Sequence, residues 1–147
     1  MMTEIYQYLN ADTELCELLE HSPQEERLKI FLGRPQSFSP HQVNDKGSFI
    51  DYPYIVYRVE PFSQAVMTSD YRVQVILVSS DDILMSQISD RLLKLLDFTK
   101  PYVERPSNVV NDTVVLNSQL QNGGSLQYHE NENVFEQIQY FLVRVKG

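Results

Sequence analysis

The clearest pattern of apolar and polar positions lies mid-chain, where the two kinds of residue alternate from Tyr71 to Ser79. Alternation that includes several β-branched residues predicts a strand with two different faces. One of these faces turns apolar at Ile76 and Val78, so we expect that end of the strand to be covered on both sides. The rest of the predicted fold is arranged around this strand.

The periodicity changes directly after the strand and predicts one long amphipathic helix. Ser80 or Asp81 can cap its first turn, because a side-chain oxygen there accepts an otherwise unpaired backbone N–H. Apolar residues recur at helical spacing and make a broad stripe that suits packing on a sheet: Ile83, Leu84, Met85, Ile88, Leu92, Leu93, Leu95 and Leu96. The polar side, which includes Arg91 and Lys94, is expected to face solvent.

Two short helices and three further strands complete the predicted framework. The helices span Thr3–Leu9 and Thr13–Glu20, and Asp12 can cap the second. The strands are Leu28–Leu32, Pro53–Glu60 and Phe135–Val145. The last strand alternates like Tyr71–Ser79, so we pair these two antiparallel, and Pro61–Asp70 is predicted to be a wide hairpin connection. The pattern predicts an α+β fold: a small, mostly antiparallel sheet packed by one long amphipathic helix plus short N-terminal helices.

Two polar segments interrupt this framework within a single predicted domain, residues 1–147. The segment 35–51 has few aliphatic residues and is predicted to be a long exposed loop, which is uncommon unless the loop is functional or disordered. Val114–Gln121 and Ser125–His129 are predicted to form a hairpin, with Asn122-Gly123-Gly124 as its turn. Because the hairpin (114–129) has little apolar surface, we expect it to project from the body or to lie on the sheet edge.

Composition narrows the class of protein. The chain has 147 residues, enough to bury roughly two-thirds of its unfolded surface in one domain. Its formal net charge is −8, with 12 basic against 20 acidic residues, which disfavours a general affinity for DNA or RNA. No apolar run approaches the ~20 residues that span a bilayer, so a soluble, intracellular chain is expected where it is made. Cys16 is the single cysteine, which excludes an internal disulfide, and it is predicted to be a small core residue.

The sequence offers no constellation typical of catalysis. The three histidines, His21, His41 and His129, are far apart and predicted to be on the surface. The pair Asp81-Asp82 suits the start of a helix better than a metal site. We therefore predict no catalytic residue, no metal site and no cofactor, and we expect the protein not to be an enzyme. A small enzyme whose site lacks a recognisable motif is the minor alternative.

Several stretches in this order resemble the tail-completion or tail-terminator family of long-tailed bacteriophages and their prophage relatives. They are the opening IYQYLNADTELCELL, the short strand KIFLG with its following loop, DYPYIVYRVEP, YRVQVILVS, the amphipathic helix and the long final strand. Together they span most of the chain. The segment Thr99–Asn133 departs from the pattern, because it is longer and more polar than expected between helix and last strand.

The resemblance implies a small subunit of the virion, made in the cytoplasm of the bacterial host. Such subunits form a homo-oligomeric ring, usually of six, which caps the tail tube and joins it to the head connector. A head-to-tail contact must close on itself, and paired strand edges can build such a contact. We expect the loop and the hairpin to make contacts through these residues: Phe38, His41, Asn44, Lys46, Phe49, Gln119, Gln121, Asn122 and Tyr128. The alternative is a non-viral protein-binding adaptor module of α+β fold.

Overall fold

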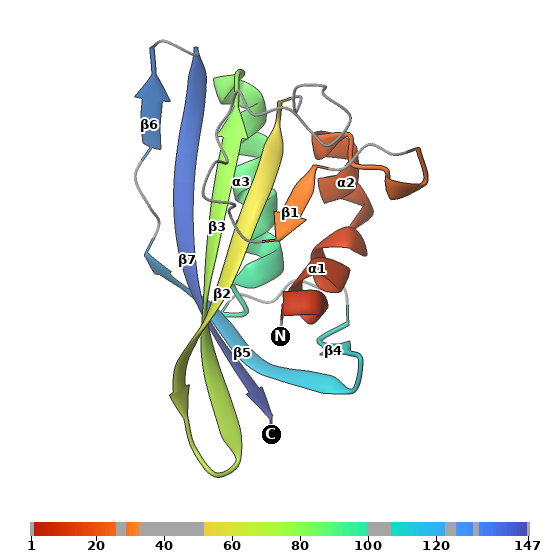
Figure 1. The fold of residues 1–147 in the computed structure, drawn as a ribbon, viewed down its shortest axis with the longest axis vertical. Coiled ribbons are helices and arrows are strands. Elements are labelled where there is room, and N and C mark those ends of the chain that lie inside the picture. Colours follow the sequence, from red (N-terminus) through yellow and green to blue (C-terminus); the bar gives the residue numbers. More distant parts are fainter. Residues whose placement is uncertain are drawn as a thin grey trace.

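The computed structural model describes residues 2–25, 29–32, 52–99, 107–122, 126–130 and 133–146. The helices are α1 (Met2–Asn10), α2 (Thr13–Leu19) and α3 (Asp82–Leu96), with a 3₁₀ turn at Pro23–Glu25. The strands are β1 (Ile30–Leu32), β2 (Tyr54–Gln64), β3 (Thr68–Ser79), β4 (Val109–Val110), β5 (Thr113–Asn122), β6 (Leu126–His129) and β7 (Val134–Lys146). The strands form one twisted sheet in the order β1-β2-β3-β7-β5-β4, with β6 also paired to β7 (Figure 1).

The two longest strands lie side by side at the centre of the sheet, and their predicted antiparallel pairing is confirmed. β3 and β7 are in register from Thr68 opposite Lys146 to Ser79 opposite Phe135. On one face of β3, Val73, Val75 and Leu77 join the main core under the helices. On the other face Ile76 and Val78 are also buried, in a second cluster with Tyr54, Val56 and Val134. The expectation that this end of the strand is covered on both sides is therefore confirmed.

The helix predicted after the central strand is α3, and Asp81 caps it. Asp81 Oδ1 accepts from the backbone N–H groups of Ile83 at 2.9 Å and Leu84 at 3.3 Å. The helix has 15 residues, about four turns, so it is of ordinary length and not long. Two side chains lie opposite to expectation, because Ile83 is 69% exposed while Arg91 is buried.

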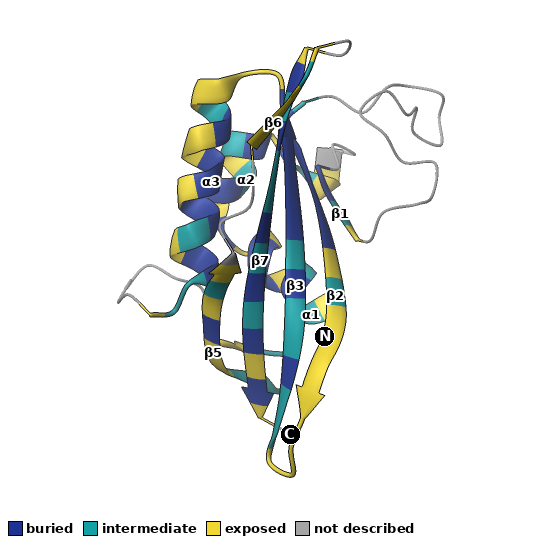
Figure 2. Cartoon of the chain, turned by 90° about the vertical axis from the view of Figure 1, so that its left-hand side faces the viewer, coloured by how far each residue is buried: buried dark blue, intermediate teal, exposed yellow. Residues whose placement is uncertain are grey.

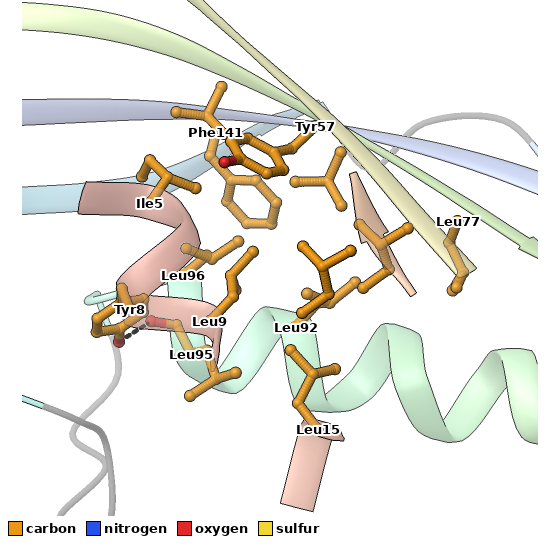
Figure 3. Close-up of a cluster of buried hydrophobic side chains, with 14 of the residues drawn as sticks. Ile5, Tyr8, Leu9, Leu15, Tyr57, Leu77, Leu92, Leu95, Leu96 and Phe141 are labelled. Atoms are coloured by element: carbon orange, nitrogen blue, oxygen red, sulfur yellow. Dashed lines mark hydrogen bonds between the residues drawn. The ribbon is translucent and has the colours of Figure 1, made fainter. Parts of the chain in front are cut away.

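The carboxyl end of α3 is tied into the fold by polar side chains. Tyr8 Oη donates to the carbonyl of Leu95, and Ser118 Oγ donates to the carbonyl of Leu96. Both carbonyls belong to the last turn, where no intrahelical partner exists. Around them Leu9, Leu92 and Phe141, among others, converge in the main core (Figure 3). Apolar packing and two terminal hydrogen bonds thus fix α3 against α1 and β5.

The sheet differs from the small, mostly antiparallel sheet that the sequence predicts. It has seven strands, and it is mixed, since β1 runs parallel to β2 while the other described pairs are antiparallel. The backbone N–H of Ile55 donates to the carbonyl of Lys29 at 2.8 Å, at the start of this parallel pair. The α+β class is retained with a larger, curled sheet.

The predicted hairpin of residues 114–129 is wrong. β5 and β6 do not pair with each other, because both run antiparallel to β7 and follow one another along the same edge of it. Val115–Asn122 lies along Val145–Tyr140, and Leu126–His129 lies along Gln137–Val134. The 13 residues of β7 are enough to pair with both segments, each at a different part of its length.

A hairpin that the sequence pattern did not predict joins β4 to β5. Asn111 and Asp112 both have positive φ, 49° and 64°, which is the conformation of the two-residue turn that suits twisted strands. The pair β2–β3 also differs, because the predicted wide connection Pro61–Asp70 is mostly strand. β2 continues to Gln64 and β3 begins at Thr68, so the β2–β3 turn is tight.

Two polar side chains, Arg91 and His21, are more buried than the sequence suggested. Arg91 is buried against Asp12, and His21 is only 5% exposed. His21 Nδ1 accepts from the backbone N–H of Lys29 at 2.9 Å, and its Nε2 lies 3.3 Å from Tyr6 Oη. The surface interpretation of His21 is therefore wrong, because the imidazole satisfies two buried polar groups where β1 begins. Cys16 is half-buried, and burial raises the pKa of its thiol.

Candidate interaction surfaces

The structure describes only part of the set of residues predicted to make subunit contacts. Phe38, His41, Asn44, Lys46 and Phe49, together with the predicted loop 35–51, lie outside the described residues. Gln119 and Gln121 are exposed on β5, and Asn122 ends that strand, with its side chain outside the described set. Tyr128 is half-exposed on β6, where its ring lies 4.8 Å from that of Phe135. The role of these residues in contacts between subunits stays a prediction.

The outer edge of β2 is poorly suited to adding a strand from another subunit. β1 pairs with β2 only from Ile55 to Tyr57, so the described part of β2 beyond that point has β3 as its partner. That stretch contains Pro61, which has no N–H to donate, and a register shift between Pro61 and Ser63. Proline and bulges are the means by which edge strands avoid pairing.

The opposite edge of the sheet is largely occupied. Val115 on β5 exchanges hydrogen bonds with Asn108, whose carbonyl and side-chain amide lie 2.9 Å from the Val115 backbone N and O. The Ser118 carbonyl accepts from the backbone N–H of Phe98 at 2.6 Å. Little of the described edge of β5 therefore remains for strand pairing between subunits. Contacts through side chains are favoured over the edge pairing expected from the sequence.

The end of the β2–β3 hairpin extends beyond the body of the molecule and carries apolar side chains. Every residue from Pro61 to Met67 is exposed (Figure 2). Phe62 is 54% exposed, Val66 95% and Met67 69%. No charged residue occurs between Glu60 and Asp70. We name Phe62, Val66 and Met67 the hairpin tip; large apolar groups grouped on a projecting turn are typical of an interaction surface.

The face of the sheet turned away from the helices forms a second candidate surface. Arg58, Arg72 and Arg144 alternate with residues of the main core, so they point away from α1, α2 and α3. In Figure 2, α1 lies behind β3 and β2. We name the part of this face that carries the arginines the sheet surface. It is made of the following residues: Arg58, Glu60, Asp70, Arg72, Tyr140, Leu142, Arg144 and Lys146.

Ion pairs and an aromatic ring order the arginines of the sheet surface. Arg144 donates to Asp70 in forked geometry, from Nε to Oδ1 at 2.8 Å and from Nη2 to Oδ2 at 3.1 Å. These hydrogen bonds lower the pKa of Asp70, so it stays ionised. The Arg72 guanidinium lies 4.3 Å from the centre of the Tyr140 ring, a cation–π contact. Arg58 lies 3.7 Å from Glu60, and both side chains are about half-exposed.

The solvent side of α2 and α3 carries the opposite charge. We name this the helix surface, and its exposed acidic residues, the two caps included, are Glu14, Glu17, Glu20, Asp81, Asp82 and Asp90. Lys94 is the exposed base among the described residues of these two helices. The sheet surface has four basic and two acidic residues, so the sheet surface and the helix surface differ in the sign of their net charge.

The described residues hold no cluster of three or more His, Cys, Asp or Glu side chains that could bind a metal ion. His129 Nε2 lies 3.1 Å from Glu136 Oε2, remote from buried His21. A hollow between α1, the end of α3 and β5 is lined mostly by apolar groups, including Ile5, Leu96 and Val115, and has a volume of about 20 Å³. That volume accommodates about one water molecule, so this hollow is too small for a substrate.

No helix in the described ranges combines the length and apolar character that crossing a membrane requires. No protein-family model matches the chain, and no curated protein matches it in sequence. Among solved structures, the fold is similar to a chain in the virion of a native gene transfer agent particle, with a TM-score of 0.56 and 13% sequence identity. The likeness covers 100% of this chain and 95% of that one. At this identity it is a likeness of fold.

Proposed function

We propose that this chain is a structural protein of virion assembly, a ring-forming tail-terminator or head–tail joining subunit of a tailed phage or prophage, and not an enzyme. The observation that carries the proposal is the full-length likeness in fold to a chain of a virion. The stretches of sequence that resemble tail-terminator proteins point the same way. In this proposal the chain works in the virion and contacts the tail tube and the head connector.

The distribution of exposed groups supports a role in contacts between proteins. The hairpin tip holds large apolar side chains outside the body, where they contribute nothing to the core. Its turn is tight, and its strands are held in register by the β2–β3 ladder. A preformed arm of this kind loses little conformational entropy when it binds. We assign the hairpin tip to the contact with a different protein of the joint, such as the tail tube.

The test is the mass of the assembled protein, measured by sedimentation velocity and native mass spectrometry. The chain is studied alone over a wide concentration range and with a tail-tube protein from the same phage or prophage. A closed ring, alone or on the tube, is the expected result, and electron microscopy should show it at the end of the tube. A chain that stays monomeric at high concentration and also in the presence of tube protein would contradict the proposal. A monomer that instead binds an unrelated cellular protein would favour the adaptor module.

A further inference from the structure

We propose that the ring is built by the sheet surface of one copy docking on the helix surface of the next. This inference rests on the proposed function and deepens it, because it names the two surfaces that join the subunits. A ring needs a head-to-tail contact, in which each copy uses two different surfaces. The two surfaces lie on different layers of the same molecule, one on the sheet and one on the helices.

Charge complementarity identifies the occupant of the sheet surface as a second copy of this chain. The sheet surface holds Arg58, Arg72, Arg144 and Lys146, four of the 12 basic residues in a chain of net charge −8. The helix surface holds six exposed acids. Two copies of so acidic a protein repel each other at most orientations, and this orientation brings opposite charges together.

The arrangement of the sheet surface favours docking of a layer over insertion of a strand. Two of its arginines, Arg144 and Arg72, are already positioned by Asp70 and Tyr140, so these two side chains have little freedom left to lose. Leu142 and Tyr140 lie between them in the register and are half-buried. The described edges of β2 and β5 are poorly suited to strand pairing because of Pro61 and Asn108, whereas the sheet surface is open to solvent between them.

Single charge reversals test the contact from both sides. Arg58→Glu reverses an exposed charge on the sheet surface, and Asp90→Arg reverses one on the helix surface. Each variant alone should weaken subunit association by about tenfold or more, because like charges then meet in every contact of the ring. Lys94→Glu is the matched control: it changes net charge as Arg58→Glu does, but it makes the helix surface more acidic and should leave association intact.

A mixture of the two variants gives the sharper result. In an equimolar mixture, the reversed charge of Arg58→Glu meets the reversed charge of Asp90→Arg in one contact, so that opposite charges face each other again, and the unaltered surfaces meet in the next contact. Ring mass should therefore return in the mixture, with both variants present in equal number by native mass spectrometry. Wild-type association should weaken as salt is raised, since ions screen these charges. Circular dichroism and the melting temperature establish that each variant is folded.

The possible failures are distinct. If wild-type rings form but Arg58→Glu and Asp90→Arg assemble as tightly as Lys94→Glu, the two surfaces are not the contact, while the proposed function stands. The same conclusion follows if Arg58→Glu and Lys94→Glu lose assembly equally while Asp90→Arg keeps it, because the change in net charge would then be the cause. A mixture that does not restore rings excludes the pairing of sheet surface with helix surface. A wild-type chain that forms no ring, alone or on the tube, overturns the proposed function and this inference together.

Discussion

Arg91 joins α3 to the start of α2 through a buried ion pair. Its Nε donates to Asp12 Oδ2 at 2.8 Å, its Nη2 donates to Asp12 Oδ1, and its Nη1 lies 2.9 Å from Glu14 Oε2. Asp12 Oδ2 also accepts from the Leu15 backbone N–H at 2.9 Å and caps α2. One carboxylate therefore serves a helix cap and an ion pair at once. Because both charges are buried, neither tolerates loss of the other.

We expect Arg91→Leu to lower the free energy of unfolding by about 3–5 kcal/mol, since it leaves the Asp12 carboxylate buried and unpaired. Urea denaturation at neutral pH measures the change. Lys94→Ala, an exposed position one turn further along α3, should stay within about 0.5 kcal/mol of wild type. Asp12→Asn combined with Arg91→Leu should recover part of the loss. Wild-type stability in Arg91→Leu would show that the pair is not needed.

His21 makes folding sensitive to acid. Burial lowers its pKa, and the nearby charge of Lys29 lowers it further. In the unfolded chain an imidazole titrates near about 6.5, so below that pH the unfolded state binds the proton first. Stability therefore falls as pH drops below about 6.5, until the folded imidazole is protonated too.

The experiment is a series of urea denaturation curves between about pH 7 and pH 5. Wild type should lose stability toward the acidic end, and His21→Gln should show a shallower dependence, because its amide does not titrate. The carboxylates of Glu4 and Asp70, whose pKa values are lowered by their hydrogen bonds, act further into the acidic range. An equal pH dependence in both proteins would contradict the assignment to His21, whatever the difference in stability at pH 7.

At the scale of elements, the projecting arm is the β2–β3 hairpin, in place of the segment 114–129 that the sequence suggested. The register of β2 with β3 runs on almost to the turn, and Ala65 N–H donates to the Thr68 carbonyl at 2.9 Å to close it. The end of this hairpin has little apolar packing to lose on mutation, because its residues are exposed.

We expect Phe62→Ser combined with Met67→Ser to leave the free energy of unfolding within about 1 kcal/mol of wild type, at about 0.5 kcal/mol per exposed site. The proposed binding to the tail tube should fall at least about tenfold, because the apolar contact of the hairpin tip is lost. Leu116→Ser combined with Leu126→Ser is the matched control in the segment first expected to project, where both side chains are also exposed. If the control variant lost more binding than the hairpin variant, the contact would be assigned to the segment 114–129 instead.

The capping and turn signals in the sequence differed in how well they predicted the structure. Asp12 and Asp81 were recognisable as caps because capping depends on neighbours three residues away. The turn at Asn111-Asp112 carried a signal too, since both residue types tolerate positive φ and Val110 and Thr113 flank them, but the short β4 offered no alternation to mark it. The Asn122-Gly123-Gly124 stretch favoured a tight turn, and pairing with the long β7 overruled it.

At the scale of the whole molecule, one layer of helices covers one face of the sheet and separates two surfaces of different charge. The helix surface is acidic and the sheet surface holds a third of the basic residues. A count of charges along the sequence shows excess acid and no pattern of this kind. The separation arises because alternate residues of β2, β3 and β7 point to opposite faces, which brings arginines from three distant segments together.

The sequence by itself determined the elements whose signals are local: the central strand, the capped helix α3, the two N-terminal helices and the final strand with its partner. Periodicity and capping depend on residues within a few positions of each other, so they can be read along the chain. Tertiary structure alone decided the seven-stranded order, the buried partners of Arg91 and His21, the projecting hairpin and the two charged surfaces. Several of these depend on segments far apart in the sequence, as Arg91 meets Asp12 across 79 residues and Arg144 meets Asp70 across 74. His21 meets Lys29 across only 8 residues, but its burial also depends on the surrounding helices and strands. Such contacts follow from how the whole core packs, which the local pattern of residues does not reveal.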